Sequence, residues 1–131
     1  ACEAQADESR AEEVVGLKDE LKGSEELSRV KEIMAQGFYR QEKLTLRDLA
    51  VALGLPEYKV RKVINKALGY RNFNEFINEY RINEAASRLL AEPETPISNI
   101  ALDVGYRTLS SFNRAFRKEK ETTPTAYREA V

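Results

Sequence analysis

Two nine-residue stretches, Leu46-Arg-Asp-Leu-Ala-Val-Ala-Leu-Gly54 and Ile97-Ser-Asn-Ile-Ala-Leu-Asp-Val-Gly105, carry apolar, small and glycine residues at the same spacing. In each copy an alanine, Ala50 or Ala101, stands four residues before the glycine. A small side chain lets two helices approach closely, and glycine adopts the positive φ of a tight turn without steric cost. The chain therefore contains one helix-turn-helix pattern twice.

Helix signals surround both copies. Thr45 with Asp48 and Asn72 with Glu75 have the spacing of N-terminal capping pairs, and Ser24 is in place to cap an earlier helix that ends at Gly37. We expect the first helix-turn-helix at about residues 45–69, a connecting helix at about 73–91 and the second helix-turn-helix at about 95–121. The predicted fold is all-α, with about seven helices forming two helix-turn-helix subdomains joined by the long connecting helix.

Charge is divided unevenly along the chain. Residues 1–27 hold nine acidic and three basic residues, a net charge of −6, whereas residues 28–131 hold 18 basic and 13 acidic residues, a net charge of +5. We interpret residues 1–27 as an acidic linker remnant, partly helical or disordered, and residues 28–131 as a basic domain. Because the chain opens at Ala1 and its first methionine is Met34, we expect it to be either a fragment of a longer polypeptide or a processed chain.

Composition disfavours several classes of protein. Histidine is absent and Cys2 is the single cysteine, so the common catalytic triads and zinc ligand sets are excluded. No phosphate loop, nucleophile motif or paired acidic site is present, and we predict neither enzymatic activity nor a cofactor, metal or small-molecule site in this fragment. No apolar run approaches the roughly 18 residues of a membrane helix, so we expect no membrane contact and a cytoplasmic location.

The second helix of each copy has one apolar face and one polar, basic face. A helix fits the DNA major groove, where arginine and lysine pair with guanine, asparagine pairs with adenine, and other basic residues hold phosphates. The candidate DNA-binding residues are Tyr58, Lys59, Arg61, Lys62 and Lys66 in the first copy and Ser110, Asn113, Arg114, Arg117 and Lys118 in the second. The alternative for either face is simple solvation, which becomes harder to sustain when two such faces follow two matched turns.

Other residues near these faces are predicted to be structural. The helical spacing of Tyr80, Phe112 and Phe116, and the position of Tyr106, indicate core packing rather than base stacking. Arg81 and Arg88 on the connecting helix are expected to pair with nearby acidic residues, and we leave them out of the site.

The connecting helix also has a suggestive length. Nineteen residues at about 1.5 Å each give about 28 Å, and successive major-groove faces lie about 34 Å apart. A rigid spacer of this order places both recognition helices in neighbouring groove segments on one side of the duplex. If the spacing falls short, we expect the DNA to bend.

Several stretches resemble the AraC/XylS family of bacterial transcription regulators over about residues 28–131. These are Leu-Thr-Leu-Arg-Asp-Leu-Ala-Val-Ala-Leu-Gly-Leu (44–55), Phe-Ile-Asn-Glu-Tyr-Arg-Ile-Asn-Glu-Ala (76–85), Ile-Ala-Leu-Asp-Val-Gly-Tyr (100–106), Ser-Ser-Phe-Asn-Arg-Ala-Phe-Arg-Lys (110–118) and Thr-Pro-Thr-Ala-Tyr-Arg (123–128). The resemblance implies a regulator that binds promoter double-stranded DNA, often as an activator that contacts RNA polymerase. It also implies that the chain is the C-terminal fragment of a longer, signal-responsive regulator.

Carried over by position, the resemblance places base contacts on Tyr58, Arg61, Lys62, Leu109, Ser110, Asn113 and Arg114. Leu109 offers only apolar contact, for example with a thymine methyl group. The chain departs from the family at Glu121, where glycine is usual before Thr-Pro, and we expect a less sharply defined helix end there.

A rival hypothesis is a helical adaptor whose basic faces dock on an acidic protein such as a polymerase subunit. Binding to random duplex DNA that weakens with salt would favour the DNA-binding hypothesis over the adaptor.

Overall fold

The computed structural model describes residues 23–130, which contain seven α-helices and no strand. Residues 23–35 form the first of these helices. The others are α2 (Leu46–Leu53), α3 (Glu57–Lys62), α4 (Phe73–Ala91), α5 (Ile97–Asp103), α6 (Leu109–Lys120) and α7 (Pro124–Glu129). A 3₁₀ turn, η1 (Phe38–Arg40), follows the first helix, and a π-helical turn, η2 (Val63–Ala67), extends α3. The predicted all-α architecture is confirmed.

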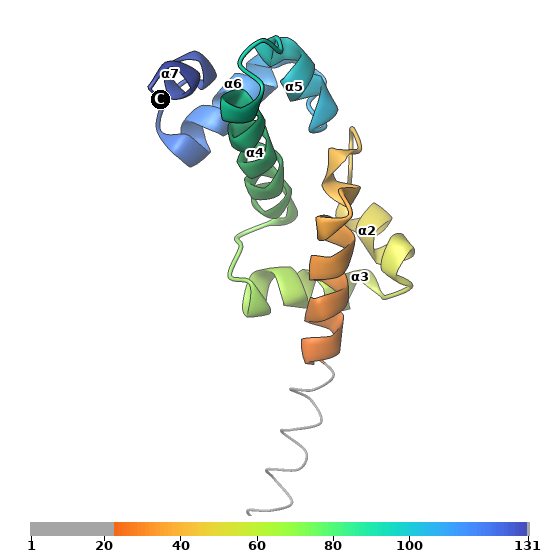
Figure 1. The fold of residues 1–131 in the computed structure, drawn as a ribbon. Coiled ribbons are helices and arrows are strands. Elements are labelled where there is room, and N and C mark those ends of the chain that lie inside the picture. The colour runs from red at the N-terminus through yellow and green to blue at the C-terminus, as the bar shows by residue number, and fades with distance from the viewer. Residues whose placement is uncertain (1–22, 131) are drawn as a thin grey trace, which may run out of the picture.

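The helices form two groups at the two ends of α4 (Figure 1). Helix 23–35, α2 and α3 surround a first core, which includes Met34, Leu49, Ile64 and Phe76. The helices α5, α6 and α7 surround a second core, in which Ile82, Leu89, Ile100, Phe112 and Phe116 are fully buried. Burial of such side chains is the main driving force for each group.

Helix α4 belongs to both groups and is the long connecting helix that the sequence predicts. It spans 19 residues and begins at Asn72, whose side chain accepts a hydrogen bond from the Glu75 amide. Its first part contributes Phe76 and Ile77 to the first core, and its second part contributes residues from Ile82 to Leu89 to the second. The two helix-turn-helix units are therefore joined by a shared, packed helix rather than by a loop.

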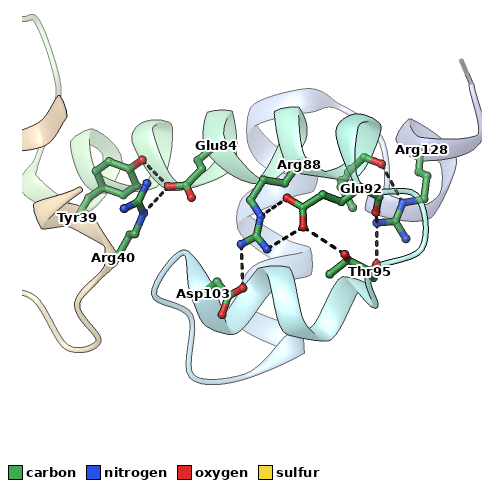
Figure 2. A network of polar contacts seen from close by, with 9 residues as sticks. Tyr39, Arg40, Glu84, Arg88, Glu92, Thr95, Asp103 and Arg128 are labelled. Atoms are coloured by element: carbon green, nitrogen blue, oxygen red, sulfur yellow. Dashed lines mark hydrogen bonds and ion pairs between the residues drawn. The ribbon is translucent and has the colours of Figure 1, made fainter. Parts of the chain in front are cut away.

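The end of α4 is closed by Arg128 of α7. Its guanidinium donates hydrogen bonds to the carbonyl oxygens of Leu89 (3.0 Å), Glu92 (3.0 Å) and Thr95 (2.8 Å). The last carbonyls of a helix have no partner within the helix, so an arginine from another element satisfies them at low cost. This contact ties the C-terminal helix to the connecting helix (Figure 2).

The two turns have the same hydrogen-bond pattern and a glycine with positive φ, as the sequence repeat predicts. Gly54 and Gly105 have φ of 67° and 113°, and Ala50 and Ala101 are each 2% exposed. The amide of the residue after each glycine donates to the carbonyl of the alanine, over 3.0 Å in both copies. This 6→1 bond is typical of the Schellman motif. The residue that donates it, Leu55 in the first copy and Tyr106 in the second, packs its side chain against the core of its own unit.

Three local expectations are wrong. Ser24 does not cap the first helix, because Gly23 is already helical. The end of α6 is well defined, because Glu121 itself adopts the left-handed conformation (φ 59°) and its amide donates to Arg117 O at 2.9 Å. Arg81 pairs with no acidic residue among those described, and instead donates to backbone carbonyls.

Most of the acidic segment predicted at residues 1–27 lies outside the described residues. Its last part, residues 23–27, forms the start of helix 23–35, and Leu27 packs against the first core. Arg29, two residues further on, donates to the carbonyl of Leu53 at the end of α2. The division at residue 27 stays a prediction for the part that precedes Gly23.

Candidate nucleic-acid interface

Helix α6 presents a clear division between a buried and a free face. Thr108 caps the helix by accepting a hydrogen bond from the Ser111 amide at 3.1 Å, which fixes where the helix begins. Phe112 and Phe116, four residues apart, are fully buried and tilt against one another with ring centroids 5.7 Å apart. Their burial leaves the opposite side of α6 in solvent.

That free side of α6 carries all six predicted residues of the second copy. Each has an exposed side chain, and Leu109 is 45% exposed. Among residues 23–130, the four ion pairs within 4.0 Å include no basic residue of this group. The exposed residues are Leu109, Ser110, Asn113, Arg114, Arg117 and Lys118. Cationic and amide donors at this face are therefore available to phosphates and base edges.

Helix α3 is shorter than α6, and four of the five residues predicted for the first copy are exposed on it or on the turn after it. Tyr58 is 64% exposed, and Arg61 and Lys62 are exposed as well. Lys66 lies beyond α3, in the π-helical turn η2. Tyr58, Lys62 and Lys66 follow one another at intervals of four residues, and Arg61 is three residues from Tyr58, so all four lie on neighbouring positions of the helix surface.

Lys59 is placed differently from the other predicted residues. Its side chain is half-buried, and its Nζ lies 4.0 Å from Glu26 Oε1 on helix 23–35. The sequence pattern assigned it to the free basic face, but the packing of helix 23–35 against α3 turns it inward. A sequence pattern does not show this, because the neighbour of Lys59 comes from 33 residues earlier in the chain.

Two hollows flank α3. The larger, about 560 Å³, lies between α3 and the start of helix 23–35, and its rim includes Tyr58, Lys62 and Lys66. The smaller, about 260 Å³, lies on the other side and is lined by Arg61, Asn65 and Arg71 among others. The basic residues of α3 and of the turn after it thus border two hollows, one on each side of the helix.

The aromatic residues that the sequence assigned to the core are there. Tyr106 is 6% exposed, its ring lies edge-on to Phe112 with centroids 5.6 Å apart, and its hydroxyl donates to Asn78 Oδ1 at 2.6 Å. Burial raises the pKa of Tyr106 above its ordinary value, because the phenolate would lose its hydration. Tyr80 is half-buried and stacks on Tyr39 with centroids 5.6 Å apart. These rings are structural.

Two exposed arginines near the recognition helices were missed. Arg71 precedes Asn72, the N-cap of α4, and Arg107 precedes Thr108, the N-cap of α6. Both stand in the tripeptide Gly-Tyr-Arg, whose glycine has positive φ (76° at Gly69 and 113° at Gly105). The repeated tripeptide in front of a capping residue was the signal that could have found them.

Ion pairs on the connecting helix serve the fold. Arg88 Nε lies 2.7 Å from Glu92 Oε2, and Arg88 Nη1 lies 2.9 Å from Asp103 Oδ2 (Figure 2). The predicted pairing of Arg88 with acidic residues is confirmed. Hydrogen bonds from Arg88 hold the pKa of Glu92 below its usual value. Arg88 therefore joins α4 to α5 within the second unit and leaves recognition to other residues.

The described part of the chain offers little to other kinds of site. No group of three or more potential metal ligands occurs within residues 23–130. Over the same residues, no helix has the length and apolar character needed to span a bilayer. What remains exposed and chemically distinctive is the pair of basic helices that follow the two matched turns.

The fold and these helices define a double helix-turn-helix protein, and comparisons with known proteins agree. Residues 49–130 match the helix-turn-helix domain family of the AraC/XylS type. Regulatory protein SoxS of Salmonella typhimurium is 36% identical over 90 residues, which are 69% of this chain and 82% of SoxS. The chain belongs to the AraC-type family of DNA-binding transcriptional regulators.

Two further relatives show how such a domain is used. Transcriptional activator NphR of Rhodococcus is 30% identical over 110 residues, which are 84% of this chain but 32% of NphR. The C-terminal domain of AraT, a response regulator from Geobacillus stearothermophilus, has a similar structure, with a TM-score of 0.72 and 31% identity over 80% of this chain and 84% of that one. The chain thus spans about a third of NphR.

Proposed function

We propose that this chain reads a two-part promoter site in double-stranded DNA, with α3 and α6 in neighbouring major-groove segments on one side of the duplex. The observation that carries the proposal is that two exposed basic helices, α3 and α6, each follow the same kind of turn. The 19-residue helix α4 joins the two units that contain them. At about 1.5 Å per residue that helix is about 28 Å long, slightly less than the roughly 34 Å groove repeat. A bend of the DNA toward the protein closes the difference.

The contacts divide into two classes. Base reading falls to Tyr58, Arg61 and Lys62 in α3 and to Leu109, Ser110, Asn113 and Arg114 in α6, the positions that the family resemblance assigns. Phosphate contacts fall to Lys66, Arg117 and Lys118, and we add Arg71 and Arg107 because both are exposed beside helix N-termini. Lys59 contacts DNA only after its ion pair with Glu26 has broken, so it is a secondary member of the phosphate-binding group.

We further propose that the chain is the DNA-binding, C-terminal part of a longer, signal-responsive regulator that acts in the cytoplasm. The short share of NphR that it covers supports this role. In this proposal the chain has no enzymatic activity, and RNA polymerase is its protein partner at the promoter. Activation rather than repression is favoured by the likeness to NphR, which is a transcriptional activator.

The first experiment selects bound sequences from a random duplex library with this chain, at two salt concentrations. We expect a two-part motif whose halves lie about one helical turn apart. We also expect binding to fall steeply with salt, since each phosphate contact releases counterions. Retention without an enriched motif would contradict sequence-specific reading by this chain. If no DNA is retained, the adaptor hypothesis replaces DNA binding.

A matched pair of variants tests the division of contacts on α6. Arg114→Ala is expected to weaken the selected site by roughly 1–3 kcal/mol and to relax one base position. Lys118→Ala, four residues along the same helix, is expected to weaken matched and mismatched sites alike and to lower the salt slope by about one. Equal effects of the two substitutions on both classes of site would refute this assignment.

A further inference from the structure

Arg81 is the only charged residue among those described that is buried, with 9% of its surface exposed. It lies on α4 between Tyr80, which packs against the first core, and Ile82, which belongs to the second. Its Nε donates to the carbonyl of Tyr39 at 2.7 Å, and its Nη2 donates to the carbonyl of Gln41 at 2.6 Å. These carbonyls belong to the segment that follows helix 23–35, in the first unit.

The same guanidinium also contacts the second unit. Its Cζ lies 5.2 Å from the centroid of the Tyr106 ring, in the turn between α5 and α6. A methyl group added at Gly105 would lie 2.8 Å from Arg81 Nε and 2.9 Å from the carbonyl oxygen of Arg40. The turn of the second unit therefore approaches the first unit as closely as a glycine permits, with Arg81 between them.

A second contact lies one turn along α4. Glu84 Oε1 accepts hydrogen bonds from the Tyr39 hydroxyl at 2.5 Å and from Arg40 Nε at 2.7 Å (Figure 2). Burial and this bond raise the pKa of Tyr39 to about 12, so the hydroxyl stays a donor at physiological pH. Residues 39–41 are thus hydrogen-bonded to Arg81 and to Glu84, on two successive turns of α4, where the helix passes from the first core to the second.

These contacts hold the two units together near residue 81, where α4 passes from the first core to the second. On each side of residue 81 the connecting helix is held by its own core. The contacts of Arg81 and Glu84, together with the hydrogen bond from the Tyr106 hydroxyl to Asn78, join the units across the junction. A buried arginine without a carboxylate partner costs desolvation energy, so the contacts of Arg81 contribute less to net stability than to the geometry of the junction.

We propose that Arg81, supported by Glu84 and seated against Gly105, fixes the angle between the two helix-turn-helix units and so restricts the protein to operators with one spacing between their halves. This inference rests on the proposed two-part reading of DNA. Arg81 acts as a positioning residue and contacts no base. Each added base pair moves a half-site by about 3.4 Å and turns it by roughly a tenth of a revolution, so a rigid pair of helices accepts few spacings.

The test compares Arg81→Met with Arg88→Met. Methionine keeps an unbranched stem and removes every donor. Arg88 is a matched control on the same helix, since its partners Glu92 and Asp103 lie at the end of α4 and in α5 of the second unit. Both proteins are offered duplexes that carry the two selected halves at several spacings. We expect the wild type and Arg88→Met to prefer one spacing by about tenfold over its neighbours, and Arg81→Met by less than about threefold.

Residual dipolar couplings of backbone amides in the free proteins supply a second readout. We expect one alignment tensor to fit both units of the wild type and Arg88→Met, and two different tensors in Arg81→Met. If Arg81→Met does not fold, Glu84→Gln replaces it in the test, because this variant leaves the Arg81 guanidinium in place. We expect Glu84→Gln to weaken the preference for one spacing less than Arg81→Met does. A folded Arg81→Met with one tensor and an unchanged spacing preference would overturn the inference. If the wild type selects no two-part site, the proposed function fails while the couplings still test the junction.

Discussion

The two helix-turn-helix units share a turn, yet the surroundings of that turn differ completely. Both glycines have positive φ and both turns close with the same hydrogen bonds. Around Gly54 there is open space for a methyl group, whereas at Gly105 the same group would meet Arg81 and the Arg40 carbonyl. The same sequence motif therefore forms an exposed turn in the first unit, whereas in the second unit the turn packs against Arg81 and the Arg40 carbonyl.

The capping of the two units differs as well. In the first unit Thr45 and Asp48 form a reciprocal capping box at α2, and the recognition helix α3 begins at Pro56 without a side-chain cap. In the second unit α5 begins at Pro96 without a side-chain cap, and the recognition helix α6 is capped by Thr108. Recognition helix α6 also runs for 12 residues, whereas α3 has six before its π-helical turn. The second unit thus presents the better-defined recognition helix.

The largest expected effect is in the core of the second unit. Phe112→Ala removes a fully buried ring that contacts Tyr106 and Phe116, and we expect a loss of roughly 3–5 kcal/mol in the free energy of unfolding. Urea denaturation measures it, and hydrogen exchange shows whether α5 to α7 open before the first unit does. Leu109→Ala on the same helix is the control, expected to change stability by less than about 0.5 kcal/mol. Comparable losses in the two variants would contradict the described burial.

The paired glycine substitutions test the comparison most directly. Gly54→Ala is expected to cost about 1–2 kcal/mol, the strain of a left-handed backbone with a Cβ. Gly105→Ala adds a clash with backbone and with Arg81, and we expect roughly 2–5 kcal/mol. Thermal or urea unfolding of both variants checks the order. Equal losses would mean that the packing at Gly105 relaxes without cost.

The sequence predicts what is local and misses what is brought from a distance. The repeat, the glycine turns, the cap of Asn72 and the length of α4 follow from spacing and capping rules alone. The inward turn of Lys59 and the carbonyl partners of Arg81 do not, since Glu26, Tyr39 and Gln41 approach them only after the helices have packed. The exposure of the α6 residues was predictable, because its apolar stripe at Phe112 and Phe116 fixes the opposite face.

The two threonine caps are expected to differ in their response to pH. Thr45→Ala and Thr108→Ala should each cost about 1 kcal/mol at neutral pH, as lost N-caps do. Hydrogen bonds from the Thr45 amide and hydroxyl hold the pKa of Asp48 below its ordinary value. A lowered pKa stabilises the fold above the unfolded pKa of about 3.9, and this contribution disappears as the pH falls through the folded value.

Consequently, the cost of Thr45→Ala should shrink in acid, whereas that of Thr108→Ala should not, since Thr108 pairs with Ser111 and no carboxylate. Urea denaturation of both variants and the wild type at pH 7 and at a series of values down to about pH 2.5 measures the difference. Parallel pH profiles for the two variants would show that the bond from the Thr45 hydroxyl to Asp48 adds nothing to stability, since the bond from the Thr45 amide remains in the variant.

The smallest expected effect concerns one residue in each unit that adopts a left-handed backbone without being glycine. These are Lys43 before α2 and Glu121 after α6, with φ of 56° and 59°. The strain of such a residue is about 1–2 kcal/mol, and glycine would relieve it at an entropic cost of about 0.5–1 kcal/mol. We therefore expect Glu121→Gly and Lys43→Gly each to stabilise the protein by about 0.5–1 kcal/mol in urea denaturation.

Glu121→Ala separates backbone strain from side-chain contacts, because alanine keeps the Cβ and removes the carboxylate. It should leave the free energy of unfolding within about 0.5 kcal/mol of the wild type. If Glu121→Ala and Glu121→Gly are both destabilising, the glutamate side chain itself holds the end of α6. If only the glycine variant is destabilising, the gain in unfolded-state entropy exceeds the strain, and the departure from glycine at this position costs the fold nothing.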